Sequence, residues 1–500
     1  MSPRLLTALI IALPLLGAAL ALLLGRWRAL QRAVAIPTVA TSLVASVALL
    51  LAVERGGTVA VQVGGWDAPF GITLVADLMS MLLLVVSLAT ALCVQLFAMG
   101  HLEASVESSY FHPLYLVLVT GVAASFLAGD LFNLFVAFEV MLIASYALLT
   151  VGGNRSAVRP AMTYVVISLL ASTLFLTAVA LLYAATGTVN MADLAGRVAE
   201  LPEALRSAFA LLLLVVFGIK AALFPLFFWL PDSYPTAPTP VTAVFAGLLT
   251  KVGVYALLRT QTTVLGGGEG GPSTLILALA GITMVVGVLG AIAQDDIKRI
   301  LSFHIVSQIG YMVLGLGLFT VAGLAGAILF VVHQIPVKTS LFLVGGMVEK
   351  ATGTVELDRL GGLVRRLPVA GALFLVAAFS LAGLPPFSGF FGKLALVQAG
   401  FGAERWLVTA VALGGSILTL FSMTKIWAGA FWGQPSDRGQ AEDSARLRVP
   451  AVMTGSAAAL VAITVGIAVF AEPLNNLSVR AAEELIDPSA YVDAVLGGGR

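Results

Sequence analysis

Residues 131–151 read LFNLFVAFEVMLIASYALLTV, an apolar run with a single carboxylate, that of Glu139, well inside it. A helix needs about 20 apolar residues to cross the hydrocarbon core of a bilayer, so this run predicts a transmembrane helix. Runs of the same kind recur along the chain. The sequence therefore predicts an all-α integral membrane protein that crosses the bilayer many times.

The composition points the same way and excludes several classes of function. Of the 500 residues, 59% are hydrophobic and 11% are charged, whereas soluble proteins carry roughly 25% charged residues. The net charge is +1 and no Lys/Arg-rich tract occurs, so we expect no nucleic-acid partner. Cys93 is the single cysteine and cannot form an internal disulfide or a thiolate cluster alone. Because no phosphate loop or metal-ligand spacing stands out, we expect no cofactor, no metal site and no enzymatic activity.

We predict about 14 transmembrane helices, joined by short loops apart from an amphipathic connector at 187–206 and a polar segment at 433–450. An even number of spans puts both termini on one face of the membrane. The opposite face carries more of the loop lysines and arginines, which predicts a cell-membrane protein with both termini extracytoplasmic. The predicted spans are 5–24, 33–53, 72–98, 110–129, 131–151, 160–186, 207–229, 240–260, 273–293, 300–321, 323–349, 369–400, 405–431 and 451–471.

The most informative residues are the lysines that fall inside these spans. A charge at the bilayer centre costs at least about 2.5–3.5 kcal/mol, so each one needs a reason. Lysine, unlike arginine, can lose its proton when it is buried, and a series of buried lysines therefore predicts a path for protons. Two members have a structural alternative, because one lies near a span end beside Trp427 and another follows Pro336, whose freed carbonyls could hold an ammonium. The five are Lys220, Lys251, Lys338, Lys393 and Lys425.

Acidic and histidine partners are scarcer. Glu139 is the natural counter-ion for a buried lysine on a neighbouring helix, either for transport or as a structural ion pair. Asp77 is expected at a hydrated span end. His304 and His333 lie in spans 10 and 11, where they are either hydrogen-bonded packing residues or relay groups, since histidine titrates near neutrality.

An internal repeat is also visible. Asp130-x8-Glu139-x6-Tyr146 recurs as Asp295-x8-His304-x6-Tyr311 at an offset of 165 residues, while Lys220 and Lys393 are 173 apart, and Lys251 and Lys425 are 174 apart. An offset of five spans inverts the copies across the membrane, as in many transporters. This predicts inverted repeats at 110–260 (spans 4–8) and 261–432 (spans 9–13), flanked by spans 1–3 at 1–109 and a C-terminal segment at 433–500. Pro225, Pro336 and Pro385-Pro386 predict broken helices in spans 7, 11 and 12.

Four stretches resemble a known superfamily: FWLPDSYPTAPTPV at 228–241, DIKRILS at 296–302, SQIGY at 307–311, and GLPPFSGF at 383–390 followed by Lys393. They are similar to the antiporter-like subunits shared by respiratory complex I, membrane-bound hydrogenases and Mrp-type cation/proton antiporters. The likeness covers most of spans 4 to 13.

The resemblance implies a role for each buried charge. Glu139 and Lys220 match the superfamily's paired carboxylate and lysine, Lys251 its relay lysine, and Lys393 its terminal lysine. His333 and Lys338 resemble the relay of a broken span 11, although the usual His-x3-Lys spacing would put the histidine where Gln334 stands. His304 and Lys425 are possible additional relay groups.

The details are most similar to the D subunits of Mrp-type sodium/proton antiporters. These details are the sequence SYPT at 233–236, the phenylalanine before Glu139, the chain length and Lys393. In addition, Phe228 stands where complex I members often have histidine, and no long lateral helix is expected after span 14. The resemblance implies a proton-translocating subunit that works with other membrane subunits, protons and sodium ions. The alternative is a redox-coupled proton-pumping subunit of complex I or a hydrogenase. A non-transporting scaffold is disfavoured by the cost of five buried lysines.

Overall fold

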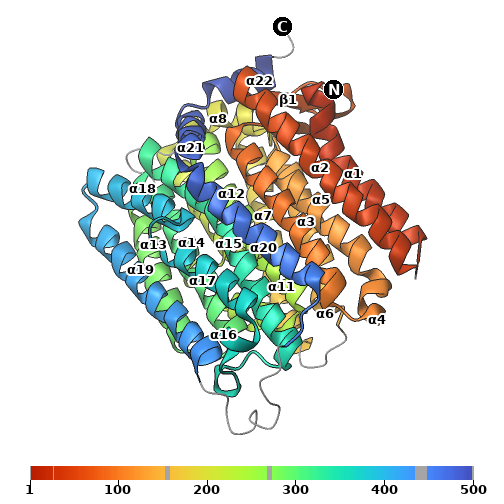
Figure 1. Ribbon diagram of the computed structural model, residues 1–500. Coiled ribbons are helices and arrows are strands. Elements are labelled where there is room, and N and C mark those ends of the chain that lie inside the picture. The colour runs from red at the N-terminus through yellow and green to blue at the C-terminus, as the bar shows by residue number, and fades with distance from the viewer. Residues whose placement is uncertain (1, 26, 153–157, 267–272, 434–446, 498–500) are drawn as a thin grey trace.

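The computed structural model describes residues 2–25, 27–152, 158–266, 273–433 and 447–497. Long helices lie side by side in one bundle, with the two short strands at one end (Figure 1). Most of the polar segment predicted at 433–450 lies outside the described residues. The helical membrane fold predicted from the sequence is confirmed.

Each of the first seven predicted spans contains most or all of one long helix. These helices are α1 (Pro3–Leu23), α2 (Arg28–Gly56), α3 (Leu78–His101), α5 (His112–Leu127), α6 (Leu131–Thr150), α7 (Val158–Thr186) and α9 (Glu203–Ala221). Span 3 begins later than predicted, because residues 73–76 form a strand. That strand, β2 (Thr73–Ala76), pairs antiparallel with β1 (Val59–Gln62).

The remaining spans are built from α11 (Thr239–Val244), η5 (Phe245–Leu249), α12 (Thr250–Arg259), η6 (Thr260–Val264), α13 (Ser273–Ile292), α14 (Ile297–Leu318), α15 (Val321–Thr352), α17 (Pro368–Ala382), α18 (Ser388–Gly402), α19 (Trp406–Ile426), η8 (Trp427–Trp432) and α20 (Ala451–Val469). Among the described residues, 12 helices are long and apolar enough to cross a membrane, counting 239–264 and 406–432 as single helices. The shorter α5 and the pair α17–α18 account for the other two predicted spans.

The connecting elements are short. They are η1 (Val63–Gly65), α4 (Ala104–Val106), η2 (Glu107–Phe111), α8 (Met191–Ala199), α10 (Trp229–Ser233), η4 (Tyr234–Thr236), η7 (Leu357–Arg359) and α16 (Leu363–Arg366). Helix α8 is the amphipathic connector, and it buries Met191, Leu194 and Val198 on one face. After span 14 the chain forms α21 (Ala471–Ile486) and α22 (Ser489–Leu496), which were not predicted. Figure 1 shows the start of α1 and helix α22 at the same end of the bundle, as an even number of spans requires.

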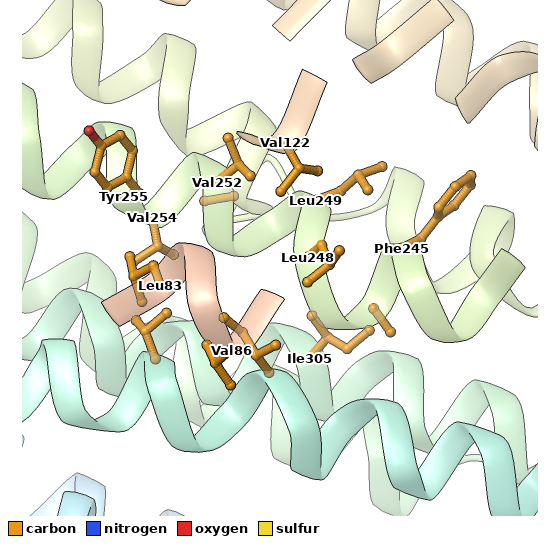
Figure 2. Close-up of a cluster of buried hydrophobic side chains, with 14 of the residues drawn as sticks. Leu83, Val86, Val122, Phe245, Leu248, Leu249, Val252, Val254, Tyr255 and Ile305 are labelled. Atoms are coloured by element: carbon orange, nitrogen blue, oxygen red, sulfur yellow. The ribbon is translucent and has the colours of Figure 1, made fainter. Parts of the chain in front are cut away.

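Span 8 and α15 form the centre of the bundle. Every residue of 239–264 is buried, as is α15 from Gly323 to Val348. Figure 2 shows apolar side chains from α3, α5, α14 and span 8 that pack together. Apolar side chains gain little by leaving apolar lipid, so membrane helices associate mainly through close packing. Small residues at the contacts let the helix backbones approach one another. A Cβ on Gly253 of α12, for example, would lie 2.7 Å from the backbone nitrogen of Ala221 in α9.

Two of the three predicted breaks are present. Helix α9 ends before Ala222, which has a left-handed φ of 63°, and the span resumes at α10. Helix α17 ends before Gly383, whose φ is 86°, and the span resumes at α18. Spans 7 and 12 are therefore broken, as predicted.

Span 11 differs from the prediction, because α15 continues without a break through Pro336. A proline removes one backbone donor, and a helix surrounded by other helices tolerates that loss when neighbouring side chains bond the freed backbone. The carbonyl that loses its donor is that of Val332, four residues before the proline, and it lies in the part of α15 that neighbouring helices bury completely. The irregular element is in span 8 instead, where the π-helical segment η5 separates α11 from α12. No proline marks the η5 segment in the sequence.

A pair of turns reveals the internal repeat more clearly than the charged residues do. Residues 186–190 read TGTVN and residues 352–356 read TGTVE. In both turns the backbone N–H of the second threonine donates to the hydroxyl of the first, at 3.5 Å and 3.4 Å, and the glycine has a φ of 75° or 76°. Each turn also pairs with the aspartate that caps the helix of span 5 or span 10, Asp130 with Asn190 and Asp296 with Glu356.

The structural register of the repeat is therefore 166 residues, because Asp296 and not Asp295 caps α14. This corrects the predicted offset of 165 and aligns Glu139 with Ile305 rather than with His304. Lys220 and Lys393 are not equivalent either, since Lys220 precedes the break in its span and Lys393 follows it. The boundaries of the four segments, at 1–109, 110–260, 261–432 and 433–500, stay a prediction.

Candidate functional site

Lys220 lies at the C-terminal end of α9, just before the break in span 7. Its side chain is 7% exposed, and its Nζ donates to Ser172 Oγ at 2.9 Å and to the carbonyl of Ser168 at 3.3 Å. The ammonium also lies 5.7 Å from the centre of the Phe138 ring. A buried lysine is thus held by a hydroxyl, a carbonyl and an aromatic face.

Glu139 lies on α6 and contacts the same serine. Ser172 Oγ donates to Glu139 Oε1, so the serine stands between the carboxylate and Lys220. Among the described residues, no ion pair within 4.0 Å links Glu139 to Lys220. The direct pair expected from the sequence is replaced by a bridge, because Ser172 of α7 is interposed.

Lys251 is the second residue of α12, which directly follows the π-helical segment. It is buried, and its Nζ donates to the carbonyl of Ala246 in η5. The close approach of Gly253 to Ala221 brings this part of α12 against the helix end that carries Lys220. A small cavity beside Lys220 reaches Leu249, the last residue of η5. The irregular segment of span 8 therefore connects the surroundings of the two lysines.

Lys338 is fully buried in the middle of α15. Within the described part of the chain, its Nζ has no hydrogen-bond partner. The next residue, Thr339, packs so tightly on η5 that a Cβ on Gly247 would lie 2.3 Å from its hydroxyl. Lys338 is also close enough to Lys251 and Lys393 to interact with both electrostatically. It thus occupies the middle of the lysine series.

His333 and Lys393 meet around the break in span 12. His333 Nδ1 lies 2.8 Å from Ser388 Oγ, which in turn lies 2.8 Å from Ser380 Oγ. Lys393 Nζ donates to the carbonyl of Ala382 at 3.0 Å and lies 4.8 Å from the centre of the Tyr311 ring. The break frees the carbonyl that Lys393 uses, since α17 ends at Ala382.

The two additional relay candidates lie nearer to α19. His304 Nε2 is 2.9 Å from Ser422 Oγ, and the histidine is fully buried. Lys425 donates to the carbonyl of Gln294 and pairs with Asp295, each at 2.7 Å, and its side chain is 29% exposed. These contacts fit the structural alternative for Lys425, in which the lysine lies at a span end and does not carry protons. The transport roles of both residues stay predictions.

The ion pair between Arg259 and Asp77 is not identified from the sequence. Asp77 is expected at a hydrated span end, and Arg259 is not among the predicted site residues. Both side chains are buried and form an ion pair, with Asp77 capping α3 and Tyr491 of α22 lying over the guanidinium at 5.1 Å. Hydropathy alone does not show this pair, because each residue lies near the end of its apolar run.

The charged residues follow one another in a line across the bundle from α6 to α18. Ser172 bridges the first two, Lys251 and Lys393 each donate to a backbone carbonyl, and His333 contacts the Ser388 hydroxyl. Within the described ranges, no group of three or more His, Cys, Asp or Glu side chains could hold a metal ion. Titratable groups linked by hydroxyls and free carbonyls are an arrangement suited to carrying protons.

Known proteins with the same sequence pattern and fold are membrane antiporter and respiratory proteins. The family described as "NADH:quinone oxidoreductase/Mrp antiporter, TM" matches residues 128–419. The D subunit of the Na(+)/H(+) antiporter of Alkalihalophilus pseudofirmus is 44% identical, over 97% of this chain and 98% of that protein. A chain of the Mrp complex from Dietzia sp. DQ12-45-1b matches with a TM-score of 0.92 and 36% identity, over 99% of this chain and 100% of that chain. A chain of the membrane-bound sulfane sulfur reductase, an archaeal respiratory complex, matches with a TM-score of 0.90 and 27% identity, over 98% and 99%.

Proposed function

The chain belongs to the NADH:quinone oxidoreductase/Mrp antiporter family, and we propose that it is the proton-translocating D-type subunit of a multisubunit sodium/proton antiporter. The observation that carries the proposal is the series of buried lysines, Lys220, Lys251, Lys338 and Lys393, to which the partly exposed Glu139 is joined through Ser172. We infer sodium as the exchanged cation from the relative in Alkalihalophilus pseudofirmus, which is 44% identical and is a subunit of a Na(+)/H(+) antiporter. We place the subunit in the cell membrane with both termini extracytoplasmic.

In the proposed mechanism, the lysines take up and release protons in turn. Burial penalises the charged form of an amine, and each described contact of Lys220, Lys251 and Lys393 is with a neutral acceptor. Such an amine can hold a proton and then give it up to the next group. The negative charge of Glu139 favours the charged form of Lys220 and so sets when that lysine releases its proton.

A redox-coupled proton-pumping subunit is the second candidate. The respiratory sulfane sulfur reductase contains a chain of the same fold at a TM-score of 0.90. The path for protons would be the same, but the driving reaction would differ. Purification from the native membrane separates the two, because an antiporter brings other small membrane subunits with it and a respiratory complex brings redox subunits.

Removal of the Lys220 amine tests the proposal. In the assembled complex, we expect Lys220→Ala to abolish proton movement driven by a sodium gradient, measured in membrane vesicles with a pH-sensitive dye. Lys350→Ala is the matched control, since Lys350 is an exposed lysine near the end of α15 that donates to the carbonyl of His101, and it should retain most of the activity. Unimpaired antiport by Lys220→Ala, at a normal level of the complex in the membrane, would refute the proposal.

A further inference from the structure

We propose that Ser172 is a positioning and proton-relay residue that couples Glu139 to Lys220. The inference rests on the proposed function, because it assigns the means by which the first two groups of the line communicate. Ser172 lies on α7, between the helices that carry the two charges. It is also buried, at 6% exposure.

The hydrogen bonds of Ser172 have a fixed direction. A serine hydroxyl has one donor and two acceptor sites. Lys220 Nζ can only donate here, so the serine accepts from it at 2.9 Å and gives its own proton to Glu139 Oε1. One hydroxyl therefore receives a hydrogen bond from the amine and passes one to the carboxylate.

The threonines of the same helix behave as ordinary membrane threonines do. Such side chains usually donate back to the carbonyl three or four residues earlier. Thr173 donates to the carbonyl of Leu169 at 3.0 Å, and Thr177 donates to that of Thr173 at 2.8 Å. Ser172 gives its hydrogen to a carboxylate on another helix instead. The contrast indicates a role for this hydroxyl beyond satisfying the backbone of α7.

The bridge allows a balanced proton transfer. An N–H bond of the Lys220 ammonium breaks as its proton forms a new O–H bond on Ser172. At the same time the original O–H bond of Ser172 breaks, and that proton forms an O–H bond on the Glu139 carboxylate. The pair changes from ammonium and carboxylate to neutral amine and carboxylic acid, with the serine unchanged. The reverse transfer reloads Lys220, which can then pass its proton toward Lys251.

Three single variants of the assembled complex test the inference. In Ser172→Ala, we expect sodium-driven proton movement to fall on the order of 100-fold, the lower range for loss of a positioned proton-transfer group. Its pH profile should also shift to lower pH, because the ammonium loses its acceptor and its link to the carboxylate. Ser172→Thr keeps the hydroxyl and should restore both the rate and the profile. Thr173→Ala removes the neighbouring, lipid-exposed hydroxyl and should leave both unchanged.

The possible outcomes separate this inference from the proposed function. A Ser172→Ala complex with the normal rate and pH profile overturns the relay while leaving the role of Lys220 in place, provided that Lys220→Ala is inactive. If the threonine variant assembles but stays inactive, Ser172→Cys supplies a smaller, weaker donor. Equal inactivity of Ala, Thr and Cys variants at normal complex levels would also overturn the inference, because the hydroxyl would then not be what matters.

Discussion

At the scale of single residues, Lys220, Lys251 and Lys393 share one property: each donates to neutral acceptors and not to a carboxylate. Lys220 uses a hydroxyl and a carbonyl, while Lys251 and Lys393 each use a carbonyl freed by an irregular helix. Lys425, the member that pairs with a carboxylate, lies at a helix end and is partly exposed. A direct ion pair would hold the charge, whereas a neutral acceptor lets the amine lose its proton.

Lys338 should show most clearly what a buried amine costs in stability. A buried polar group without a hydrogen bond costs about 1–3 kcal/mol, and Lys338 Nζ has no partner among the described residues. We expect Lys338→Met, which fills similar space, to raise the thermal stability of the purified complex while abolishing antiport. Lys425→Met breaks an ion pair and should not raise the stability. A Lys338→Met complex that melts below the wild type would contradict this account.

The sequence identified every charged member of the line but not the way its members are joined. A lysine or glutamate in an apolar run is visible at once, so Glu139 and the five lysines could be named. Ser172 could not, because serines are common in such runs and only the packing shows that α7 lies between the two charges. The pair formed by Asp77 and Arg259 is missed for a related reason, since each finds its partner from another part of the chain.

At the scale of helices, a proline alone does not decide where a span breaks. Spans 7 and 12 break at a residue with left-handed backbone, Ala222 or Gly383. Helix α15 has no such residue around Pro336 and continues. The loss of one donor is tolerable inside a packed bundle, whereas a left-handed residue ends the helix. The sequence shows prolines but not backbone angles, so it predicted two of these three spans correctly and missed η5.

The C-terminal helix α21 should dock in a pH-dependent way. Burial and the nearby Asp77 carboxylate raise the pKa of Glu484 from its ordinary 4.5 to about 7. The docked helix therefore binds more protons than the released one between these values, and its docking weakens as the pH rises from about 4.5 through 7. We expect faster intrinsic-rate-corrected hydrogen exchange in α21 at pH 8.5 than at pH 6.

Two substitutions in α21 check the origin of that effect. Glu484→Gln removes the titrating group and should make the exchange rates at the two pH values equal. Glu483→Gln changes the neighbouring exposed glutamate and should leave the pH dependence intact. Persistence of the pH dependence in Glu484→Gln would assign it to another group.

At the scale of the whole molecule, the chain contains two copies of one turn, 166 residues apart, in parts of the bundle related by five spans. Each copy ties the chain to the capped start of a helix, α6 or α14, through Asp130 or Asp296. The sequence suggests the repeat through its charged residues, but those residues differ in type or position between the two copies. The uncharged TGTV turns have the same hydrogen bonds, and they set a register of 166 residues, whereas the charged residues indicate offsets of 165, 173 and 174.

If the two turns are equivalent, equal changes should have equal effects. Gly187 and Gly353 have left-handed backbones, and a Cβ on either would meet no described atom within 4 Å. Alanine at each position should therefore cost only the backbone penalty of about 1–2 kcal/mol, seen as matching drops in the melting temperature of the complex. Gly196→Ala is the control, since Gly196 lies inside helix α8 with open space around it, and alanine there should stabilise by about 0.5–1 kcal/mol. Clearly unequal drops in melting temperature for the Gly187 and Gly353 variants would mean that the two turns do not contribute equally to the stability of the complex.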